Sequence, residues 1–218
     1  MDSVLQQLPA RRPRADGLRS RHKILDAAAR LATVEGLEGL SIGRLADHIG
    51  MSKSGLYAHF GSKEELQLAT VDHAAQIFRD DVIRPTETVE RPLARLEALC
   101  EAFFSHLERR VFPGGCFFVS AAAEFDTHPG PVKHEVASFL RGWLGTLEEL
   151  ASRAQQEGFL DPSEDPTQLA FELDAFLLMA NAAFLLYDDP VAVERARSAI
   201  RARINRAQGP LPSPTAKS

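Results

Sequence analysis

Hydrophobic residues recur at intervals of three and four positions along most of the chain, which is the spacing of one face of an α-helix. The first such stripe runs from Ile24 to Ala32 and is followed by Gly36, a residue type that commonly ends a helix. No segment alternates hydrophobic and polar residues over enough positions to predict a β-strand. The pattern therefore predicts an all-α fold.

Serine and glycine divide the next part of the pattern into two short helices. Ser41 precedes a predicted helix over residues 42–49, which Gly50 ends. Ser52 precedes a second short helix, which Gly61 ends. The two helices are thus expected to be joined by a very tight turn.

A capping box and several prolines mark the starts of the longer helices. Residues 62–65 read Ser-Lys-Glu-Glu, which opens a helix towards Ile83 that Pro85 stops. Proline suits the first turn of a helix because no N–H is needed there. With these starts, the remaining predicted helices cover residues 92–110, 116–126, 131–157, 166–187 and 191–207. The chain is thus expected to form about nine helices.

The net charge of −5 conceals a basic front and an acidic remainder. Residues 1–63 carry a net charge of +4, and residues 64–218 carry a net charge of −9. A basic segment on an acidic protein is typical of a region that binds a polyanion such as nucleic acid. An unstructured basic arm that only aids solubility would give the same distribution, so charge alone leaves both interpretations open.

Composition and motifs exclude several classes of protein. With 44% hydrophobic and 25% charged residues, the chain has an ordinary globular composition. Its most apolar stretch, residues 169–187, is interrupted by polar residues, so we expect no membrane span. The first residues lack the apolar core of a secretion signal, and Cys100 and Cys116 are too few for a disulfide framework, so we expect the cytoplasm. The chain has no nucleotide-binding glycine loop, nucleophile elbow or zinc ribbon.

The stretch over residues 41–60 has the layout of a helix-turn-helix. Its first helix places Leu45 and Ala46 on an inner face, and its second helix places Leu56 and Phe60 there. A second helix held in this way can lie in the major groove of DNA. An ordinary helical hairpin with a polar face is the alternative, and the basic front of the chain favours DNA binding.

The outward side of this hairpin carries residue types that suit DNA. Lysine, tyrosine and histidine side chains can reach phosphates, and short serine and alanine side chains can approach base edges. Gly55 is expected to let the helix approach the DNA backbone without an intervening side chain. The candidate DNA-binding residues are Ser41, Gly43, Ser52, Lys53, Ser54, Gly55, Tyr57, Ala58, His59 and Lys63.

The same region resembles the DNA-binding domain of the tetracycline-repressor (TetR) family of bacterial transcriptional regulators. The matching features are Gly36, Ser41-Ile42, Leu45-Ala46, Gly50-Met51-Ser52, Leu56-Tyr57, His59-Phe60 and residues 62–66. The resemblance implies three N-terminal helices that bind DNA and a ligand-responsive, dimerising helical body. Ser54 and Gly55 depart from the usual pair before Leu-Tyr, which affects the expected base preference but not the docking mode.

The organisation that follows has two domains and two flexible ends. Residues 1–19 are expected to form a disordered basic arm, and residues 208–218 a disordered tail. Residues 20–66 are expected to form the helix-turn-helix domain, and residues 67–207 the helical body for ligand binding and dimerisation.

The last helix carries an apolar stripe that we interpret as a dimer face. The preceding helix is apolar on nearly all sides, so it must be covered on all sides, and a partner chain would cover part of it. The resemblance implies a four-helix bundle formed by these two helices and their symmetry mates. A C-terminal helix that folds back on its own body is the alternative. The predicted interface residues are Val193, Ala196, Ile200 and Ile204.

Aromatic and isolated polar residues in the body are candidates for a ligand site. Phenylalanine walls select a ligand by shape and hydrophobicity, and the acids would favour a cationic or hydroxyl-bearing group. The same residues would otherwise form a solid core or a solvated edge. The candidates are Phe103, Phe117, Ser120, Glu124, Trp143, Asp174, Phe176, Met179 and Asn181.

Other patterns are weaker. His128 and His134 lie near acidic residues but lack the spacing of a metal site, so we expect no metal and no cofactor. There are two alternative functions. The chain could be a helical enzyme that uses Glu124 and these histidines, or a scaffold that binds another protein. The chain is predicted to be a ligand-responsive, non-enzymatic repressor that binds a palindromic operator in double-stranded DNA as a homodimer. Its predicted effector is small and mostly apolar.

Overall fold

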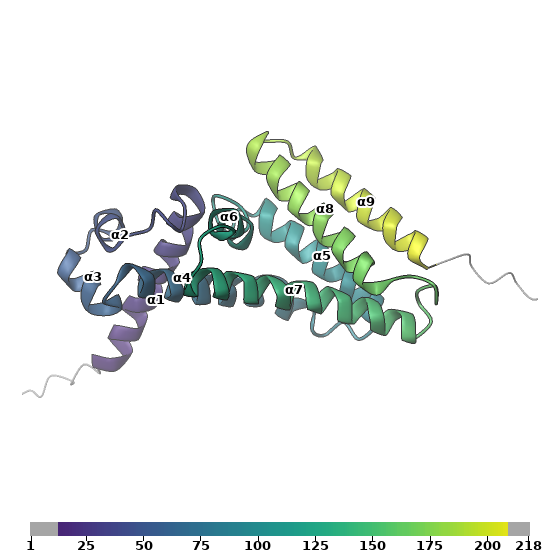
Figure 1. The fold of residues 1–218 in the computed structure, drawn as a ribbon, viewed down its shortest axis with the longest axis horizontal. Coiled ribbons are helices and arrows are strands. Elements are labelled where there is room, and N and C mark those ends of the chain that lie inside the picture. The colour runs from purple at the N-terminus through teal and green to yellow at the C-terminus, as the bar shows by residue number, and fades with distance from the viewer. Residues whose placement is uncertain (1–12, 209–218) are drawn as a thin grey trace, which may run out of the picture.

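A computed structural model describes residues 13–208, and these residues form an all-α protein (Figure 1). The helices are α1 (Pro13–Glu35), α2 (Ile42–Ile49), α3 (Lys53–Phe60), α4 (Lys63–Phe78), α5 (Pro92–Glu108), α6 (Phe117–Phe125), α7 (Pro131–Gln156), α8 (Pro166–Leu186) and α9 (Val191–Ala207). A π-helical turn, η1 (Arg79–Ile83), and a 3₁₀ turn, η2 (Arg84–Thr86), continue from α4, so Pro85 lies within the second turn rather than directly after the helix. The nine helices predicted from the sequence are therefore present in the described part of the chain.

The helix boundaries differ from the sequence-based ones by one or two residues, except at the beginning. The first helix starts at Pro13, whereas the basic arm was expected to extend to residue 19. The prediction of disorder is therefore wrong for residues 13–19, because the helical hydrogen-bonding pattern continues through this polar stretch. The remainder of the predicted arm and nearly all of the predicted tail lie outside the described residues.

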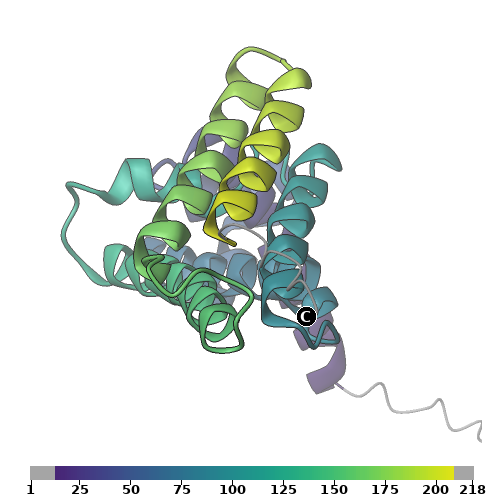
Figure 2. The ribbon, with the colours of Figure 1, turned by 90° about the vertical axis from the view of Figure 1, so that its right-hand side faces the viewer.

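The molecule is elongated, with the helix-turn-helix at one end and α8 and α9 at the other (Figure 1). The long helices α4 and α7 pack against each other and connect the two ends. Seen from the α9 end, α8 and α9 stand beside α5 above the base that α7 forms (Figure 2). Helix α6 contacts both α1 and α7, so it touches the DNA-binding domain as well as the body.

Aromatic rings fill the centre of the body. Phe78 lies edge-on to four of them, in a cluster contributed by α4, α5, α6 and α7. Phe118 also stacks on Phe139, with the two rings 11° from parallel. The rings around Phe78 are Phe103, Phe118, Phe139 and Trp143. This cluster fixes α4 and α7 side by side and therefore sets the distance between the two ends of the molecule.

Helix α8 is the most apolar helix of the body. By length and composition it could cross a membrane, which corrects the expectation that no segment would pass this test. Core helices of globular proteins pass the same test, and α8 packs against α5, α7 and α9. Its Glu172 accepts a hydrogen bond from Arg203, and its Asp174 accepts one from Trp143 Nε1 at 2.9 Å. We therefore interpret α8 as a helix of the protein core.

Candidate DNA interface and ligand cavities

The helix-turn-helix is built by local hydrogen bonds at its helix ends. Ser41 Oγ accepts from the Arg44 N–H at 3.3 Å, and Ser52 Oγ accepts from the Gly55 N–H at 3.1 Å. Between the two helices, Gly50 adopts φ +68°, a left-handed conformation that glycine enters without a steric penalty. These caps place α3 across α2 in the geometry that the sequence predicts.

Helix α3 is held from beneath by the first helix. Leu56 is fully buried and Phe60 is nearly so. Arg21 of α1 stacks over the Phe60 ring at 4.5 Å and donates to the backbone carbonyl of His59 at 2.7 Å. His59 itself is half-buried at the end of α3, so its ring lies at the margin of the exposed face rather than at its centre.

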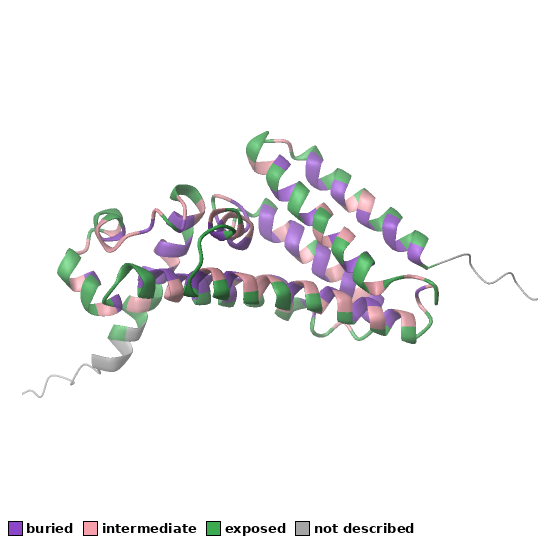
Figure 3. Cartoon of the chain, viewed as in Figure 1, coloured by how far each residue is buried: buried purple, intermediate pink, exposed green. Residues whose placement is uncertain are grey.

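The opposite side of α3 is open to solvent. Lys53, Ser54, Tyr57 and Ala58 are all exposed, and Tyr57 is 59% exposed although it is large and aromatic. The exposed colour on α3 marks this side of the helix in Figure 3. No other secondary-structure element covers this face in the described part of the chain. An exposed helix face of this kind, with a lysine and a tyrosine, is suited to the phosphates and base edges of a major groove.

Two glycines of the motif have local explanations. A Cβ atom on Gly55 would lie 2.9 Å from Ser52 Oγ, so this glycine makes room for the cap of its own helix. A Cβ atom on Gly43 would lie 3.6 Å from Lys53 Cε, so Gly43 borders the path of that lysine. The sequence-based interpretation of Gly55 as a point of approach to DNA misses this intramolecular role.

The predicted ligand residues do not converge on one space. Phe103 and Phe117 are buried in the aromatic core. Asn181 Oδ1 accepts from the Cys116 N–H at 2.9 Å, at the start of α6, so Asn181 supports α6 rather than a ligand. Glu124 Oε2 accepts from the Glu38 N–H at 2.9 Å and thereby joins the end of α6 to the loop between α1 and α2. In this structure these four residues make intramolecular contacts, and their role in a ligand site stays a prediction.

The remaining candidates lie in several separate places. Phe176 and Met179 line a groove between α8 and α9 at the outer surface of the molecule. Ser120 is half-buried on α6 and lines neither of the two cavities described below. Trp143 and Asp174 are in direct contact through the Trp143 Nε1 hydrogen bond.

Asp174 lines an apolar cavity between α6, α7 and α8. The cavity measures about 340 Å³ and is lined by Phe118, Val119, Ala122, Leu140, Arg141, Leu144, Asp174 and Leu178. Burial raises the pKa of the Asp174 carboxyl above its usual range, and the hydrogen bond from Trp143 opposes this shift only in part. We name this space the Asp174 cavity. Its walls are mostly apolar, and its charged groups are the Asp174 carboxyl and the Arg141 guanidinium.

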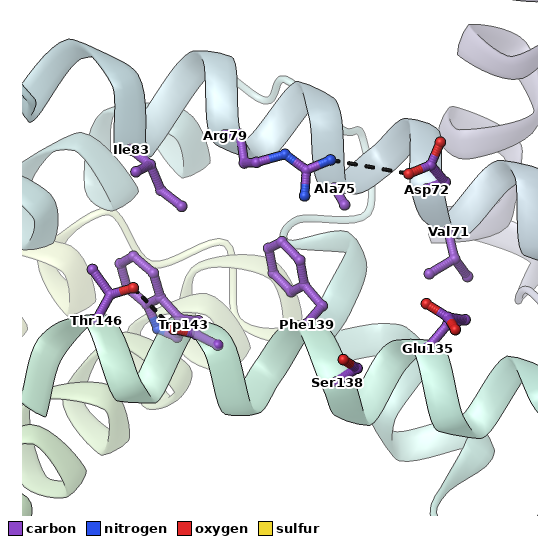
Figure 4. Close-up of a pocket in the computed structure, with 11 residues that line it drawn as sticks. Val71, Asp72, Ala75, Arg79, Ile83, Glu135, Ser138, Phe139, Trp143 and Thr146 are labelled. Atoms are coloured by element: carbon purple, nitrogen blue, oxygen red, sulfur yellow. Dashed lines mark hydrogen bonds and ion pairs between the residues drawn. The ribbon is translucent and has the colours of Figure 1, made fainter.

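A second space lies between α4 and α7 and is more polar (Figure 4). Trp143 and Phe139 of α7 line one side, and Asp72 of α4 and Arg79 of η1 lie on the opposite side. Arg79 and Asp72 are separated by 4.0 Å and are both substantially exposed, so their ion pair is weak. This cleft of about 350 Å³ is therefore open to water along the flank of α4.

The apolar stripe on α9 faces its own protomer. Val193 and Ile204 have no exposed surface, and Ala196 and Ile200 are also buried. Val193, Ile200 and Ile204 are thus covered within their own protomer, whereas Ala196 also lines the groove between α8 and α9, so the position of the dimer interface stays a prediction. The exposed apolar side chains at this end are instead Phe171, Leu178, Met179, Leu186, Tyr187 and Val191, mostly on α8.

Two family models match the chain. The model for the bacterial regulatory proteins of the tetR family matches residues 24–70, which include α2, α3 and about half of each of α1 and α4. The model for the tetracyclin repressor-like C-terminal domain matches residues 92–200, which is half of the chain. The chain belongs to the TetR family. Members of this family are DNA-binding transcription regulators and not enzymes, so the prediction of a non-enzymatic regulator is confirmed.

Curated and solved relatives agree with this assignment. The chain is 27% identical to the transcriptional repressor ComR of Escherichia coli over 166 residues, 72% of this chain and 75% of ComR. It is 34% identical over 88 residues to the transcriptional activator FasR of Mycolicibacterium smegmatis, which is 40% of each chain. A TetR transcriptional regulator from Chloroflexus aurantiacus superimposes with a TM-score of 0.82 at 26% identity, over 88% of this chain and 97% of that one.

One further solved relative carries its ligands. AibR, in complex with isovaleryl coenzyme A and operator DNA, superimposes with a TM-score of 0.69 at 26% identity. The match covers 88% of this chain and 100% of AibR. The TetR family thus includes members that bind both operator DNA and a small effector, as predicted for this regulator.

Lys63 of this TetR-family chain is paired within its own domain. Lys63 Nζ donates to Glu38 Oε1 at 2.7 Å, and this hydrogen bond holds the pKa of the Glu38 carboxyl below its usual range. Both side chains are well exposed, so the pair contributes little to stability. Lys63 can therefore leave Glu38 and bind a DNA phosphate with little loss of folding stability.

We predict that Lys63→Ala weakens binding to all DNA sequences about equally. Each neutralised phosphate releases counterions, so the slope of log K against log salt concentration should decrease in magnitude by about one. The melting temperature should remain close to that of the wild type, because the ion pair is exposed. Fluorescence anisotropy at four salt concentrations gives the slope. An unchanged slope would remove Lys63 from the set of phosphate contacts.

The buried carboxyl of Asp174 makes a second prediction possible. Its pKa in the folded protein lies above the unfolded value, so the folded protein holds the proton more tightly. Stability therefore decreases as the pH rises through the window between the two pKa values, and the loss is complete above it. Asp174→Asn retains an oxygen that accepts from Trp143 and removes the charge.

We expect Asp174→Asn to melt at a higher temperature than the wild type at pH 7. The difference should shrink as the pH is lowered and should vanish below about pH 4, near the unfolded pKa of an aspartate. Differential scanning calorimetry at several pH values measures it. A variant that melts below the wild type at pH 7 would mean that the charged carboxylate is stabilised in the folded protein.

Both cysteines are buried in the body. Burial raises the pKa of Cys100 to about 12 and that of Cys116 to about 11. A thiol reacts as its thiolate, which is scarce at these pKa values. Both residues therefore behave as small apolar core side chains.

Proposed function

We propose that the chain is a repressor that binds a palindromic operator as a homodimer and releases it when a mostly apolar effector enters the body. The exposed face of α3, with Lys53 and Tyr57 held outward by capped helices, is the observation that carries the DNA-binding part. A transcription regulator of this kind acts on chromosomal DNA, so we expect it in the bacterial cytoplasm.

The apolar surface of α8 supports the homodimer. Met179 and Tyr187 are exposed beside a groove of about 310 Å³ between α8 and α9, whose lining is largely apolar. Single exposed apolar residues are common, but a contiguous apolar stretch along one helix marks an interaction surface. A second copy of this chain fits it best, because a two-fold dimer pairs the same surface on both protomers and presents two copies of α3 to an inverted repeat.

The Asp174 cavity supports the effector. Its mostly apolar lining suits a lipophilic molecule, and the Asp174 carboxyl favours a cationic or hydroxyl-bearing group beside it, while Arg141, the other charged residue of the lining, is exposed to solvent. The cavity is also placed to transmit a signal. Phe118, Val119 and Ala122 of α6 form one wall, and Glu124 at the end of the same helix accepts from the Glu38 N–H in the DNA-binding domain.

A ligand that displaces α6 would therefore move the loop between α1 and α2. Glu38 of that loop also holds Lys63 and contacts Gln67 on α4, so the displacement would reach the entry to α4. A ligand shifts such an equilibrium only if it binds one conformation better than the other. The effector is thus expected to bind best to the conformation that does not bind DNA.

The relatives include both repressors and an activator, so the direction of regulation is part of the proposal. Repression requires only that the bound dimer occupies a promoter, and no additional surface for a polymerase is needed. Deletion of the gene tests this directly. Transcripts next to the operator should rise in the deletion strain, and a fall would show an activator instead.

The effector is tested by a screen and a matched pair of variants. Lipophilic cations and alcohols that raise the melting temperature are assayed for release of operator DNA. Ala122→Phe fills the Asp174 cavity and should abolish both effects, whereas Ala123→Phe, exposed on the same helix, should retain them. If hits stabilise and release DNA equally in both variants, the effector binds elsewhere.

A further inference from the structure

A cluster of two histidines and one aspartate lies where the DNA-binding domain meets α4. His22 and Asp26 are four residues apart on α1, and His73 lies on α4. Their ligand atoms all lie within 4.8 Å of one another, with His73 Nε2 at 2.6 Å from Asp26 Oδ1 and His22 Nε2 at 3.8 Å from Asp26 Oδ2. We propose that this cluster is a binding site for a divalent transition-metal ion of the Zn²⁺ type, which links α1 to α4.

The donor atoms define the class of ion. Two imidazole nitrogens and one carboxylate oxygen suit Zn²⁺ and its neighbours in the transition series, whereas Mg²⁺ and Ca²⁺ prefer oxygen donors alone. The two cysteines are buried elsewhere in the body, so no thiolate joins the set. The site is therefore of the type with three protein ligands and an additional open position.

The geometry requires only small side-chain movements. Zn²⁺ binds nitrogen and oxygen at about 2.0–2.2 Å, which places tetrahedral ligand atoms roughly 3.4 Å apart. The His73–Asp26 pair must open by less than about 1 Å to reach that spacing, and the His22–Asp26 pair must close slightly. The rings of His22 and His73 are already edge to face, with centroids 4.7 Å apart, so both can turn towards a common point.

The three residues differ in burial, and the cluster is accessible to an ion from solvent. His73 is buried, Asp26 is half-buried, and His22 is exposed. The two histidines border a polar cleft between α1, α4 and the end of α5, about 630 Å³ in volume. An ion can therefore enter from solvent, and water can occupy the open position.

Such an ion would add to a junction at which α1 and α4 already pack against each other and His73 bonds Asp26. Helix α4 runs from the helix-turn-helix into the body, so α1 and α4 must keep their angle for the two domains to move together. The binding free energy of a metal whose ligands come from two helices stabilises the contact between those helices. The ion would thus act on the joint between the domains, away from both α3 and the Asp174 cavity.

The test uses the full chain without a histidine tag, freed of metal by chelation. Zn²⁺ is titrated calorimetrically, and Co²⁺ serves as a second probe because its visible absorption reports bound nitrogen and oxygen ligands. His22→Gln and Asp26→Asn remove exposed or half-buried ligands and should fold, and His134→Gln, an exposed histidine on α7, is the matched control. Thermal unfolding is measured with and without Zn²⁺ for all four proteins.

We expect one Zn²⁺ per chain in the wild type and in His134→Gln, with a higher melting temperature when the ion is bound. His22→Gln and Asp26→Asn should each bind Zn²⁺ at least about tenfold more weakly and lose that stabilisation. Excess Mg²⁺ should not compete. The proposal is overturned if the wild type does not bind Zn²⁺, if the two ligand variants bind it as tightly as the wild type, or if His134→Gln loses binding to the same extent.

Discussion

Met179→Glu is expected to convert the dimer to a folded monomer and to abolish tight binding to a full operator. Met179 is 58% exposed in the protomer, so a glutamate there leaves the fold intact. In the proposed interface the same carboxylate would be buried without a partner, twice in each dimer because of the two-fold symmetry. An unpaired buried charge costs several kcal/mol, which corresponds to a dimer about a thousandfold weaker.

Light scattering gives the mass, and anisotropy with one and two half-sites gives the affinity. Val34→Glu introduces the same charge at an apolar residue that is 64% exposed on α1, and this control should remain a dimer. Ile204→Glu, at a fully buried position, should instead unfold the body. A Met179→Glu protein that remains dimeric at low micromolar concentration would place the interface elsewhere.

Gly114→Ala is expected to destabilise the protein by about 3 kcal/mol, at the upper end of the usual range for overpacking. The Gly114 N–H donates to Thr33 Oγ1 at 3.1 Å, so the loop between α5 and α6 is docked directly on the end of α1. A Cβ atom at this position would collide with the Thr33 backbone carbonyl, which cannot move aside as a flexible side chain can. The loop must then leave α1, and its hydrogen bond is lost.

Thermal unfolding measures this effect, which should amount to roughly 5–10 °C for a chain of this size. Gly145→Ala is the control, because a Cβ atom on this glycine of α7 meets nothing within 4 Å. Alanine has the higher helix propensity, so the control should match or exceed the wild-type melting temperature. Equal melting temperatures for Gly114→Ala and the wild type would show that the loop is not docked against α1 in solution.

The helix-turn-helix could be predicted from the sequence because its determinants are local. Ser41, Gly50 and Ser52 act on residues within three or four positions of themselves, through caps and one left-handed turn. The inward position of Leu56 and the outward position of Tyr57 follow from helical periodicity alone. The structure therefore confirms the predicted helix caps and the predicted inward or outward position of these side chains.

The interior of the body could not be predicted in the same way. Periodicity showed that α9 has an apolar stripe but could not show that its own protomer covers it, because that depends on how α8 and α9 cross. Glu124 and Asn181 interrupt apolar faces and looked like ligand groups. Each instead accepts a hydrogen bond from a backbone N–H more than sixty residues away, and no spacing in the sequence reveals such a contact.

The cluster of His22, Asp26 and His73 also depends on a contact between residues that are distant in the sequence. His22 and Asp26 have the four-residue spacing of ligands on one helix face, which is visible in the sequence. Their third partner, His73, is 47 residues from Asp26 and is brought to it by the packing of α4 on α1. Because His22 and Asp26 alone are too few ligands to indicate a metal site, the sequence analysis predicted no bound metal.

Selection of genomic DNA fragments tests the central claim most directly. The purified protein is mixed with sheared DNA of the bacterium that encodes it, and the retained fragments are sequenced at low and moderate salt concentrations. A variant with both Lys53→Ala and Tyr57→Ala on the exposed face of α3 is the matched control. We predict that the wild type enriches a small set of promoter fragments sharing an inverted repeat, with half-sites about one or more helical turns apart, and that the control enriches none. Failure of the wild type to enrich any fragment at low salt, or equal enrichment by the control, would contradict the account.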